Sequence, residues 1–338
     1  MLLQVQAVTK EYRGGTRAND GITLSVGAGE VFGLLGHNGA GKTTLIGQVV
    51  GLARPTTGRI AIDGHDVVAD PGFARRSCSL QPQAQVPIVG LTARTAIELM
   101  GRLRGGDRRL VGARTEELAA ALDIAGWLDT RAERLSGGVL RLVAFCMAAV
   151  VPGRIVILDE PTNDVDPLRR RLLWRQVREL GDRGSAVLLV THNVLEAERA
   201  VDRLAILERG RIVAEGTPAS LRTAHGGGLR MELAVEPGVR FESPGFLLSP
   251  VWAGCRLTAA LRDERLAEAV GWANAQKRSG LVEEFSIGPV TLEDVYVRLA
   301  GESTGERTGG GVGDGTGEAA VEPAGRIVNR EDLDALAA

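Results

Sequence analysis

Short apolar runs alternate with helical patterns along the first 225 residues of the chain. The apolar runs have the length and spacing of strands, and they are LQVQAV, ITLSV, VFGLL, GRIAID, RIVILDE, AVLLVTH and RLAILERGRIVAEG. The stretches KTTLIGQVVGL and PLRRRLLWRQVRELGDRG between them have the spacing of helices. Strands that are apolar on both faces are typical of a buried parallel sheet. The pattern therefore predicts an α/β fold for residues 1–225.

The remaining stretches predict a helical insertion and two further regions. Residues from about 83 to 150 are mostly helical in pattern, as in TARTAIELMGRLRG and RTEELAAALDIAGW, which predicts a helical subdomain within the α/β core. The glycine-rich TAHGGG at 223–228 predicts a linker. For residues 226–301 we expect a small α+β domain, with strands at LRMELAV and LVEEFSI and helix over most of LTAALRDERLAEAVGWANAQKR and TLEDVYVRLAG. The Gly-rich, acidic residues 302–338 predict disorder, with a short helix at EDLDALAA.

Composition narrows the classes of partner. The net charge is −2, so no overall basic field attracts nucleic acid, and we expect no nucleic-acid partner. The three cysteines are scattered and form no CxxC pattern, which suits a reducing cytosol. The longest apolar run, VLRLVAFCMAAVVP, is interrupted by Arg141 and is too short to cross a bilayer. We therefore expect the chain to reach a membrane only through a partner.

The stretch GHNGAGKT, from Gly36 to Thr43, matches the phosphate-binding pattern GxxxxGK[ST]. It follows the predicted strand VFGLL and opens a predicted helix, which is the context that this loop requires. Its glycines let backbone N–H groups surround phosphate oxygens. Lys42 is expected to reach the terminal phosphates of a nucleotide, and the Thr43 hydroxyl to ligate Mg²⁺.

Two acids end the predicted strand in RIVILDEPT. Asp159 at the end of that strand is expected to hold Mg²⁺, directly or through water. Glu160 would then face the γ-phosphate and polarise the attacking water as a general base. An acidic turn after a strand is common by itself, and the upstream phosphate loop is what favours the catalytic interpretation.

Three further residues have alternatives that the pattern leaves open. His192 follows the apolar strand in LLVTHN, whose end should lie beside the Asp159–Glu160 strand end, so it is either a γ-phosphate contact or an ordinary histidine. Gln83, in SLQPQAQVP, has no function that composition reveals. Tyr12, in KEYRGG, either stacks on a purine or packs against the protein.

A second glycine loop, LSGG at 135–138, precedes a helical run and carries no lysine. The N-terminus of a helix favours anions, because its free N–H groups and the helix dipole both attract negative charge. The chain therefore has two loops that suit phosphate.

With GHNGAGKTT, LSGG and LDEPT in this order, residues 1 to about 225 resemble the ATP-binding-cassette (ABC) ATPases, which have a P-loop NTPase fold. The resemblance implies ATP and Mg²⁺ as cofactors. It implies catalytic roles for Glu160, His192 and Gln83, with Thr43, Gln83 and Asp159 as metal ligands. The nucleotide-binding positions that it implies are Tyr12, Gly36, Asn38, Gly39, Ala40, Gly41, Lys42, Thr43, Thr44, Ser136, Gly137, Gly138 and Asp166.

The resemblance also implies partners. In this family two copies form a head-to-tail dimer, and the LSGG loop of one copy completes the ATP site of the other, so the second loop needs no lysine. The resemblance implies a separate membrane permease as a partner. It also implies that the chain lies at the cytoplasmic face of the membrane, bound through that permease. LTARTAIELMGRLRG (91–105) and VTLEDVYVRLAG (290–301) resemble stretches of the daunorubicin-resistance-like drug-export ATPases. The alternatives are export of a lipid or polysaccharide, or a slow ATPase outside transport that acts as a nucleotide-dependent regulator.

The helix after LSGG departs from the family pattern. Val139, Leu140 and Leu142 stand where this family often has polar residues. We expect this segment to have lost polar groups near the phosphate of the partner copy and at the surface of the helical subdomain. The expected consequence is weaker dimerisation on ATP and a slow basal ATPase.

Overall fold

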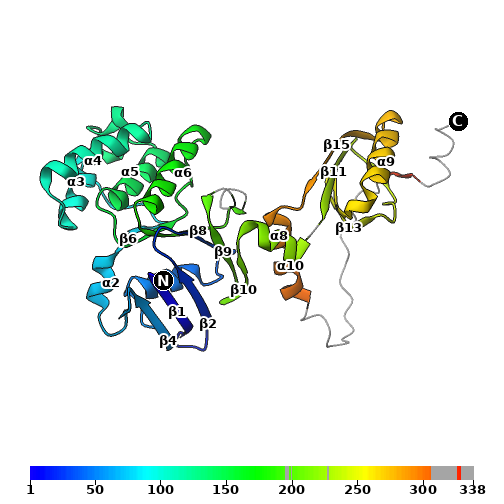
Figure 1. Ribbon diagram of the computed structural model, residues 1–338. Coiled ribbons are helices and arrows are strands. Elements are labelled where there is room, and N and C mark those ends of the chain that lie inside the picture. The colour runs from blue at the N-terminus through cyan, green and yellow to red at the C-terminus, as the bar shows by residue number, and fades with distance from the viewer. Residues whose placement is uncertain (195–197, 199, 227, 306–325, 329–338) are drawn as a thin grey trace. The chain divides into compact units, whose positions relative to one another are not determined.

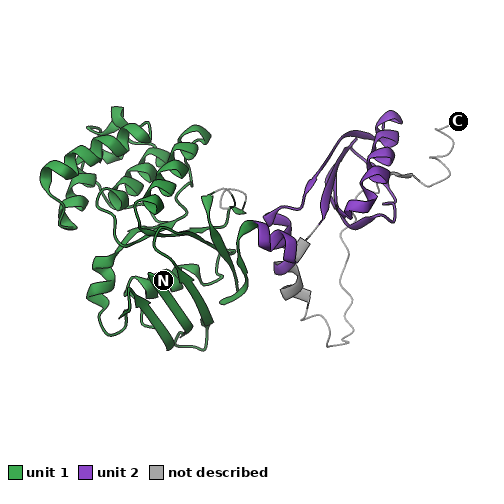
Figure 2. Cartoon of the chain, in the orientation of Figure 1, with its two compact units in different colours: residues 1–218 green, residues 219–338 purple. Residues whose placement is uncertain are grey.

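The chain forms two compact units, residues 1–218 and 219–338 (Figure 2). The computed structural model describes residues 1–194, 198, 200–226, 228–305 and 326–328. Across these parts of the chain, none of the helices has both the length and the apolar character needed to cross a bilayer.

A six-stranded, mainly parallel sheet lies at the centre of the first unit (Figure 1). Its strands, in spatial order, are β10 (Arg211–Gly216), β9 (Arg203–Glu208), β3 (Val31–Leu35), β8 (Ala186–Thr191), β7 (Ile155–Asp159) and β6 (Cys78–Gln81). Only β10, which forms a hairpin with β9, is antiparallel to its neighbour. Every residue of β3, β7 and β8 is buried, which explains their continuous apolar sequences.

A second, antiparallel sheet shares its core with the first. Its strands, in spatial order, are β2 (Arg17–Val26), β1 (Leu3–Glu11), β4 (Thr57–Ile62) and β5 (His65–Asp66). Apolar side chains from both sheets and from helix α1 (Lys42–Val49) form one buried cluster that includes Phe32, Leu45 and Ile60. This cluster holds α1 and the phosphate loop before it against both sheets.

Helices make up most of the rest of the first unit. They are α2 (Pro71–Ser77), α3 (Ala93–Leu103), α4 (Arg108–Ala121), α5 (Gly137–Ala149) and α6 (Pro167–Asp182), with short 3₁₀ turns at Ala125–Trp127 and Ala132–Arg134. Side chains of Thr92, Asp107 and Asp166 accept backbone N–H bonds at the starts of α3, α4 and α6, which fixes where these helices begin. Helix α3 packs against α4 and α5, so these three form the helical part that the sequence pattern predicts (Figure 1).

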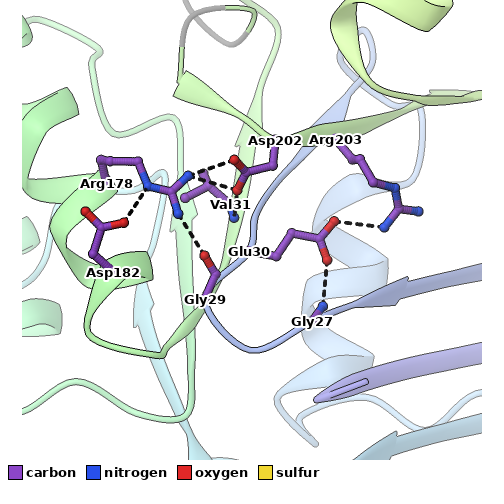
Figure 3. Close-up of polar contacts among 8 residues, drawn as sticks. All are labelled: Gly27, Gly29, Glu30, Val31, Arg178, Asp182, Asp202 and Arg203. Atoms are coloured by element: carbon purple, nitrogen blue, oxygen red, sulfur yellow. Dashed lines mark hydrogen bonds and ion pairs between the residues drawn. The ribbon is translucent and has the colours of Figure 1, made fainter.

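A polar network fixes the start of β3, at the end opposite to the phosphate loop (Figure 3). Arg178 on α6 donates to both carboxylate oxygens of Asp202 at 2.9 and 2.8 Å, and to the carbonyl of Gly29 at 2.7 Å. Asp202 in turn accepts from the N–H of Val31 at 2.8 Å. These contacts join α6, the approach to β9 and the first residue of β3, and so set the register of the strand that leads into the loop.

The second unit is a small α+β unit. Its antiparallel sheet has the order β13 (Leu247–Ala253), β14 (Arg256–Leu261), β11 (Leu229–Val235) and β15 (Val282–Pro289). Its helices are α8 (Pro218–Gly226), α9 (Leu266–Arg278) and α10 (Leu292–Gly305), and the short strands β12 (Val239–Phe241) and β16 (Arg326–Val328) pair in parallel. A buried cluster that includes Met231, Leu257 and Ala273 joins α9 to this sheet.

Several details differ from the sequence predictions. A linker was predicted at 223–228, but residues 223–226 belong to helix α8, so the prediction is wrong for these four residues. The predicted domain boundary between residues 225 and 226 also falls inside this helix. The first part of the predicted helix in LTAALRDERLAEAVGWANAQKR is the strand β14. The strands that were not predicted also include β5, β6, β12, β13 and β16. The predicted disorder of residues 302–338 is wrong at 302–305, which belong to α10, and at 326–328, which form β16. The rest of that region, residues 306–325 and 329–338, lies outside the described residues, as does the predicted helix EDLDALAA.

Candidate functional site

A cavity of about 370 Å³ collects the candidate residues that follow β3, β6 and β7. It is lined by Ala18, Asn38, Gly39, Gly41, Lys42, Thr43, Thr44, Gln83, Asp159 and Glu160. Because β3, β6 and β7 are parallel, their carboxyl ends meet at one edge of the sheet, where ligands of open α/β sheets bind.

The phosphate loop presents backbone to this cavity. Gly39 and Gly41 have φ angles of 88° and 107°, a region that glycine adopts without strain. A Cβ on Gly41 would lie 2.2 Å from the carbonyl oxygen of Ala18, whereas a Cβ on Gly39 would meet nothing within 4 Å. Helix α1 then begins at Lys42 with no side-chain cap. An uncapped helix start beside an open cavity is suited to bind an anion.

Lys42 carries a buried positive charge into the cavity. Its Nζ donates to the carbonyls of Gly36 and His37, the latter at 3.0 Å. Burial lowers the pKa of Lys42, and the negative charges of Glu160 and Asp159 oppose that effect. The ammonium is thus held between its own loop and two acids.

Asp159 is the last residue of β7, and its carboxyl group has a raised pKa. Burial first, and the neighbouring Glu160 second, raise the pKa of Asp159 to about 6, against the opposing effect of Lys42 and Arg141. A cation beside Asp159 would favour its charged form. Thr43 and Gln83 line the same cavity and add a hydroxyl and an amide oxygen, which are the hard donors that Mg²⁺ prefers.

The donor set fits a metal ion that is shared with a phosphate ligand. Within the described ranges, no three His, Cys, Asp or Glu side chains form a cage for a metal. Mg²⁺ in proteins is commonly held by one or two carboxylates together with substrate phosphates. The residues of the cavity therefore fit Mg²⁺ bound together with a nucleotide.

Glu160 is held by the end of the neighbouring strand β8. Its carboxylate accepts from the Thr191 hydroxyl at 3.0 Å and from the backbone N–H of His192 at 2.9 Å, and His192 Nδ1 lies 2.7 Å from it. Glu160 also has a φ of 51°, a left-handed conformation that is uncommon for a residue with a side chain. The prediction that this histidine follows a strand beside β7 is confirmed, because Asp159 pairs with Val190.

The LSGG loop lies outside the residues that line the cavity. Ser136 is the N-cap of α5, and its Oγ accepts from the N–H of Val139 at 3.4 Å. A Cβ on Gly138 would lie 2.4 Å from the carbonyl of Asp164, so this loop packs directly against the segment that follows Glu160. Only glycine permits so close an approach.

Several other residues that were predicted to contact the nucleotide do not line the cavity either. Asp166 caps α6 by accepting from the backbone N–H groups of Leu168 and Arg169. Tyr12 follows β1 and is half-exposed, with the Lys10 ammonium 5.2 Å from its ring. Gly36, Ala40, Gly137 and His192 likewise do not line the cavity.

Sequence reasoning missed a buried support under the phosphate loop. The Asn19 side chain donates to the carbonyl of Gly41 at 3.0 Å and accepts from Gln48 Nε2 at 2.7 Å. Both amide side chains are fully buried. The available signal was a glutamine on the apolar face of α1, which requires a polar partner within the core.

Two of the three positions after LSGG that depart from the family pattern are core positions of this chain. Val139 and Leu142 are buried, 5% and 0% exposed. Leu140 is half-buried. The expected effect of these positions on dimerisation and on the ATPase rate stays a prediction.

Val139→Gln is therefore expected to destabilise the chain. Burying an amide without hydrogen-bond partners costs roughly 1–3 kcal/mol. The measurement is the urea midpoint of the variant, with Leu140→Gln as the control at a half-buried neighbour. Equal midpoints for Val139→Gln and the unaltered chain would contradict the burial argument.

Asp159→Asn is expected to stabilise the chain in the absence of ligands at pH 7.5. The folded carboxyl has a pKa of about 6 against an ordinary value of 3.8, so the folded state holds its proton more tightly than the unfolded state. The free energy of unfolding then falls as pH rises from about 4 to about 6, by about 3 kcal/mol in total. Asparagine does not ionise, so the variant keeps the free energy of unfolding that the unaltered chain loses. Below pH 4, where the carboxyl is protonated in both states, the variant should be no more stable than the unaltered chain.

Thermal melts of both chains between pH 3.5 and 8 test this. Asp166→Asn is the control, because hydrogen bonds from the Arg169 backbone, followed by that residue's guanidinium, lower the pKa of Asp166. That substitution should not stabilise the chain at any pH. A gain for Asp159→Asn that is equal at all pH values would rule out ionisation as its cause.

Comparisons with known proteins agree with this geometry. A family model described as ABC transporter matches residues 19–163. The chain is 34% identical over 307 residues to the daunorubicin/doxorubicin resistance ATP-binding protein DrrA of Streptomyces peucetius, covering 88% of this chain and 92% of that protein. It is 35% identical over 298 residues to the Nod factor export ATP-binding protein I of Mesorhizobium japonicum, covering 87% and 85%.

The fold has matching solved structures as well. A solved ATP-binding subunit of an ABC transporter superposes with a TM-score of 0.63 at 30% identity, over 67% of this chain and 94% of that one. Together with the phosphate loop and the two acids at one edge of the sheet, these similarities show that the chain belongs to the ABC transporter family, as an ATP-binding, ATP-hydrolysing subunit.

Proposed function

We propose that this chain hydrolyses Mg²⁺-bound ATP in the cavity and thereby drives a separate membrane permease that exports a drug or antibiotic. The observation that carries the proposal is the convergence of Lys42, Gln83 and the Asp159–Glu160 pair, from three separate segments, on one cavity. The similarity to the daunorubicin/doxorubicin resistance protein over most of both chains supports the choice of cargo class.

Each side chain of the cavity has a task in this proposal. Lys42 and the backbone of the phosphate loop bind the terminal phosphates, and Thr43, Gln83 and Asp159 would hold Mg²⁺. When bound, the metal would supply electrostatic polarisation of the γ-phosphate. Glu160 takes the proton of the attacking water, and its hydrogen bonds to the end of β8 keep its carboxylate in place.

The proposed active form is a dimer of two copies. Ser136 and the following glycines start a thirteen-residue helix, α5, whose N-terminus favours an anion. They do not line the cavity of their own chain. Following the resemblance to the ABC ATPases, we assign them to the ATP held by the second copy. Such an interface is two-fold and isologous. In this arrangement Asp166 belongs to the same interface, and Tyr12 stacks on adenine.

The permease is proposed from the relatives. Both curated relatives are named as ATP-binding proteins, one for resistance and one for export. A subunit of this kind lies at the cytoplasmic face of the membrane through its permease. The names of these two relatives refer to different exported molecules. Export of a lipid or polysaccharide is therefore the alternative to export of a drug.

A tagged Glu160→Gln chain, expressed in its native host with ATP present and purified from solubilised membranes, tests the permease. A stoichiometric multi-span membrane protein in the mass spectrum is the expected result. Recovery in the soluble fraction alone would contradict transport. For the cargo, deleting the gene should raise daunorubicin accumulation, and the unaltered gene, but not Lys42→Ala, should reverse it.

A further inference from the structure

Helix α5 carries one charged side chain among apolar residues, Arg141. Leu142, Val143 and Phe145, which follow it on the helix, are core residues, and Arg141 itself is only 8% exposed. A buried charge is strongly unfavourable unless polar groups surround it. The polar contacts of the Arg141 guanidinium therefore explain how its charge is accommodated among apolar residues of α5.

The guanidinium binds the backbone of the loop that carries Gln83. It donates to the carbonyls of Pro82 at 3.0 Å and Gln83 at 2.8 Å. The carbonyl of Arg141 accepts in return from the side chain of Gln81 at 3.1 Å. Three hydrogen bonds thus join one residue of α5 to the end of β6 and to the loop after it.

The loop that Arg141 holds forms part of the cavity. Gln83 and Asp159 line the same cavity. Arg141 therefore contacts one wall of the site through its hydrogen bond to the carbonyl of Gln83.

We propose that Arg141 is a positioning residue for the ATPase site, which holds the Gln83 loop to the helix that begins at the LSGG loop. The same helix would then contribute to two ATP sites, with its N-terminus at the site of the second copy and Arg141 behind Gln83 in its own site. A displacement of either loop is transmitted to the other through three hydrogen bonds. This inference rests on the function proposed above for Gln83 and for Ser136–Gly138.

The chain supplies a matched control in Arg104 at the end of α3. This arginine donates to the carbonyls of Val151 at 2.7 Å, Cys78 at 2.8 Å and Arg76 at 3.2 Å. Arg104 therefore joins the helical part to Cys78, the first residue of β6. Arg141 joins the helical part to Pro82 and Gln83, which follow the last residue of β6. The two arginines make the same kind of contact at opposite ends of one strand.

The first test measures hydrogen exchange of the protein without nucleotide. Arg141→Gln should speed exchange between residues 83 and 89 by about tenfold or more at the amide of Ile88, which donates to the carbonyl of Val86 at 2.9 Å. Arg104→Gln should leave that amide unchanged and act on residues 76–79. Arg141→Lys keeps the charge but lacks the planar fork for two carbonyls, so it should give an intermediate rate.

The second test separates turnover from binding. Arg141→Gln should lower kcat by about tenfold or more, because Gln83 is displaced from its catalytic position. The Kd for a fluorescent ATP analogue without Mg²⁺ should change less than about twofold, because the Lys42 loop is untouched. Arg141→Lys should recover part of kcat, and Arg104→Gln should leave it unchanged at temperatures where all variants are folded.

Two outcomes would overturn the inference. One is exchange between residues 83 and 89 that is equal in all variants, because the hydrogen bonds would then not hold the loop. The other is a kcat that Arg141→Gln leaves unchanged, or that Arg104→Gln lowers as much. If Arg141→Gln does not fold, Arg141→Lys is judged against Arg104→Gln on the same two measurements. An unaltered chain without ATPase activity would instead refute the proposed function, and the exchange measurement would still decide whether Arg141 holds the loop.

Discussion

Glu160→Gln is expected to slow ATP hydrolysis by at least about a hundredfold while the chain continues to bind ATP. General-base catalysis contributes about 10²–10⁴-fold to rates, and an amide cannot accept the proton of the attacking water. The amide oxygen can still accept from the N–H of His192, which the carboxylate now does at 2.9 Å, so the shape of the site should survive. The change therefore isolates proton transfer.

Steady-state phosphate release and equilibrium binding of a fluorescent ATP analogue measure the two effects separately. Size-exclusion chromatography with ATP adds a third observation, because a chain that binds ATP without hydrolysing it should remain a dimer. Full activity in Glu160→Gln would show that another group takes the proton.

The matched control is Glu30→Gln at the opposite end of the sheet. Glu30 precedes β3, accepts from the N–H of Gly27 at 2.6 Å and pairs with Arg203 at 2.8 Å (Figure 3). Its side chain is mostly buried, as that of Glu160 is, but it lies at the amino end of the strands. Its substitution should change stability and leave kcat unaltered, so a loss of kcat in both variants would point to general damage.

The cavity was largely predictable because its chemistry is local in sequence. The phosphate loop needs glycine at fixed positions, and the acids must end a buried strand, so a short stretch of sequence reveals each. The parallel arrangement then brings the strand ends together, as the pairing of Asp159 with Val190 shows. The neighbourhood of Glu160 and His192 follows from that one pairing.

The supports of the cavity were not predictable, because they join distant parts of the chain. Arg141 meets Gln83 across 58 positions, and Asn19 meets Gly41 across 22. In both cases the sequence shows only a polar residue in an apolar setting, which demands a partner but does not identify it. Strand β6 was missed because four residues, Cys78–Gln81, with two polar side chains form no clear pattern.

Lys42→Ala should weaken ATP binding by about a hundredfold, in contrast to Glu160→Gln, which should spare it. Hydrogen bonds to charged groups contribute about 1.5–3 kcal/mol each, and about 2.8 kcal/mol corresponds to a hundredfold change in Kd. The ammonium now donates to Gly36 and His37 of its own loop, so a phosphate has only to replace neutral carbonyls as acceptors.

Equilibrium binding of ATP, with and without Mg²⁺, measures this loss. Lys277→Ala on α9 is the control, because it removes a lysine from the other compact unit. A melting curve must accompany the titration, since Lys42 also offsets the charges of Asp159 and Glu160. An affinity unchanged by Lys42→Ala would mean that the loop from Gly36 to Thr43 does not bind phosphate. The assignment of Glu160 as general base depends on that γ-phosphate position and would then have to be abandoned too.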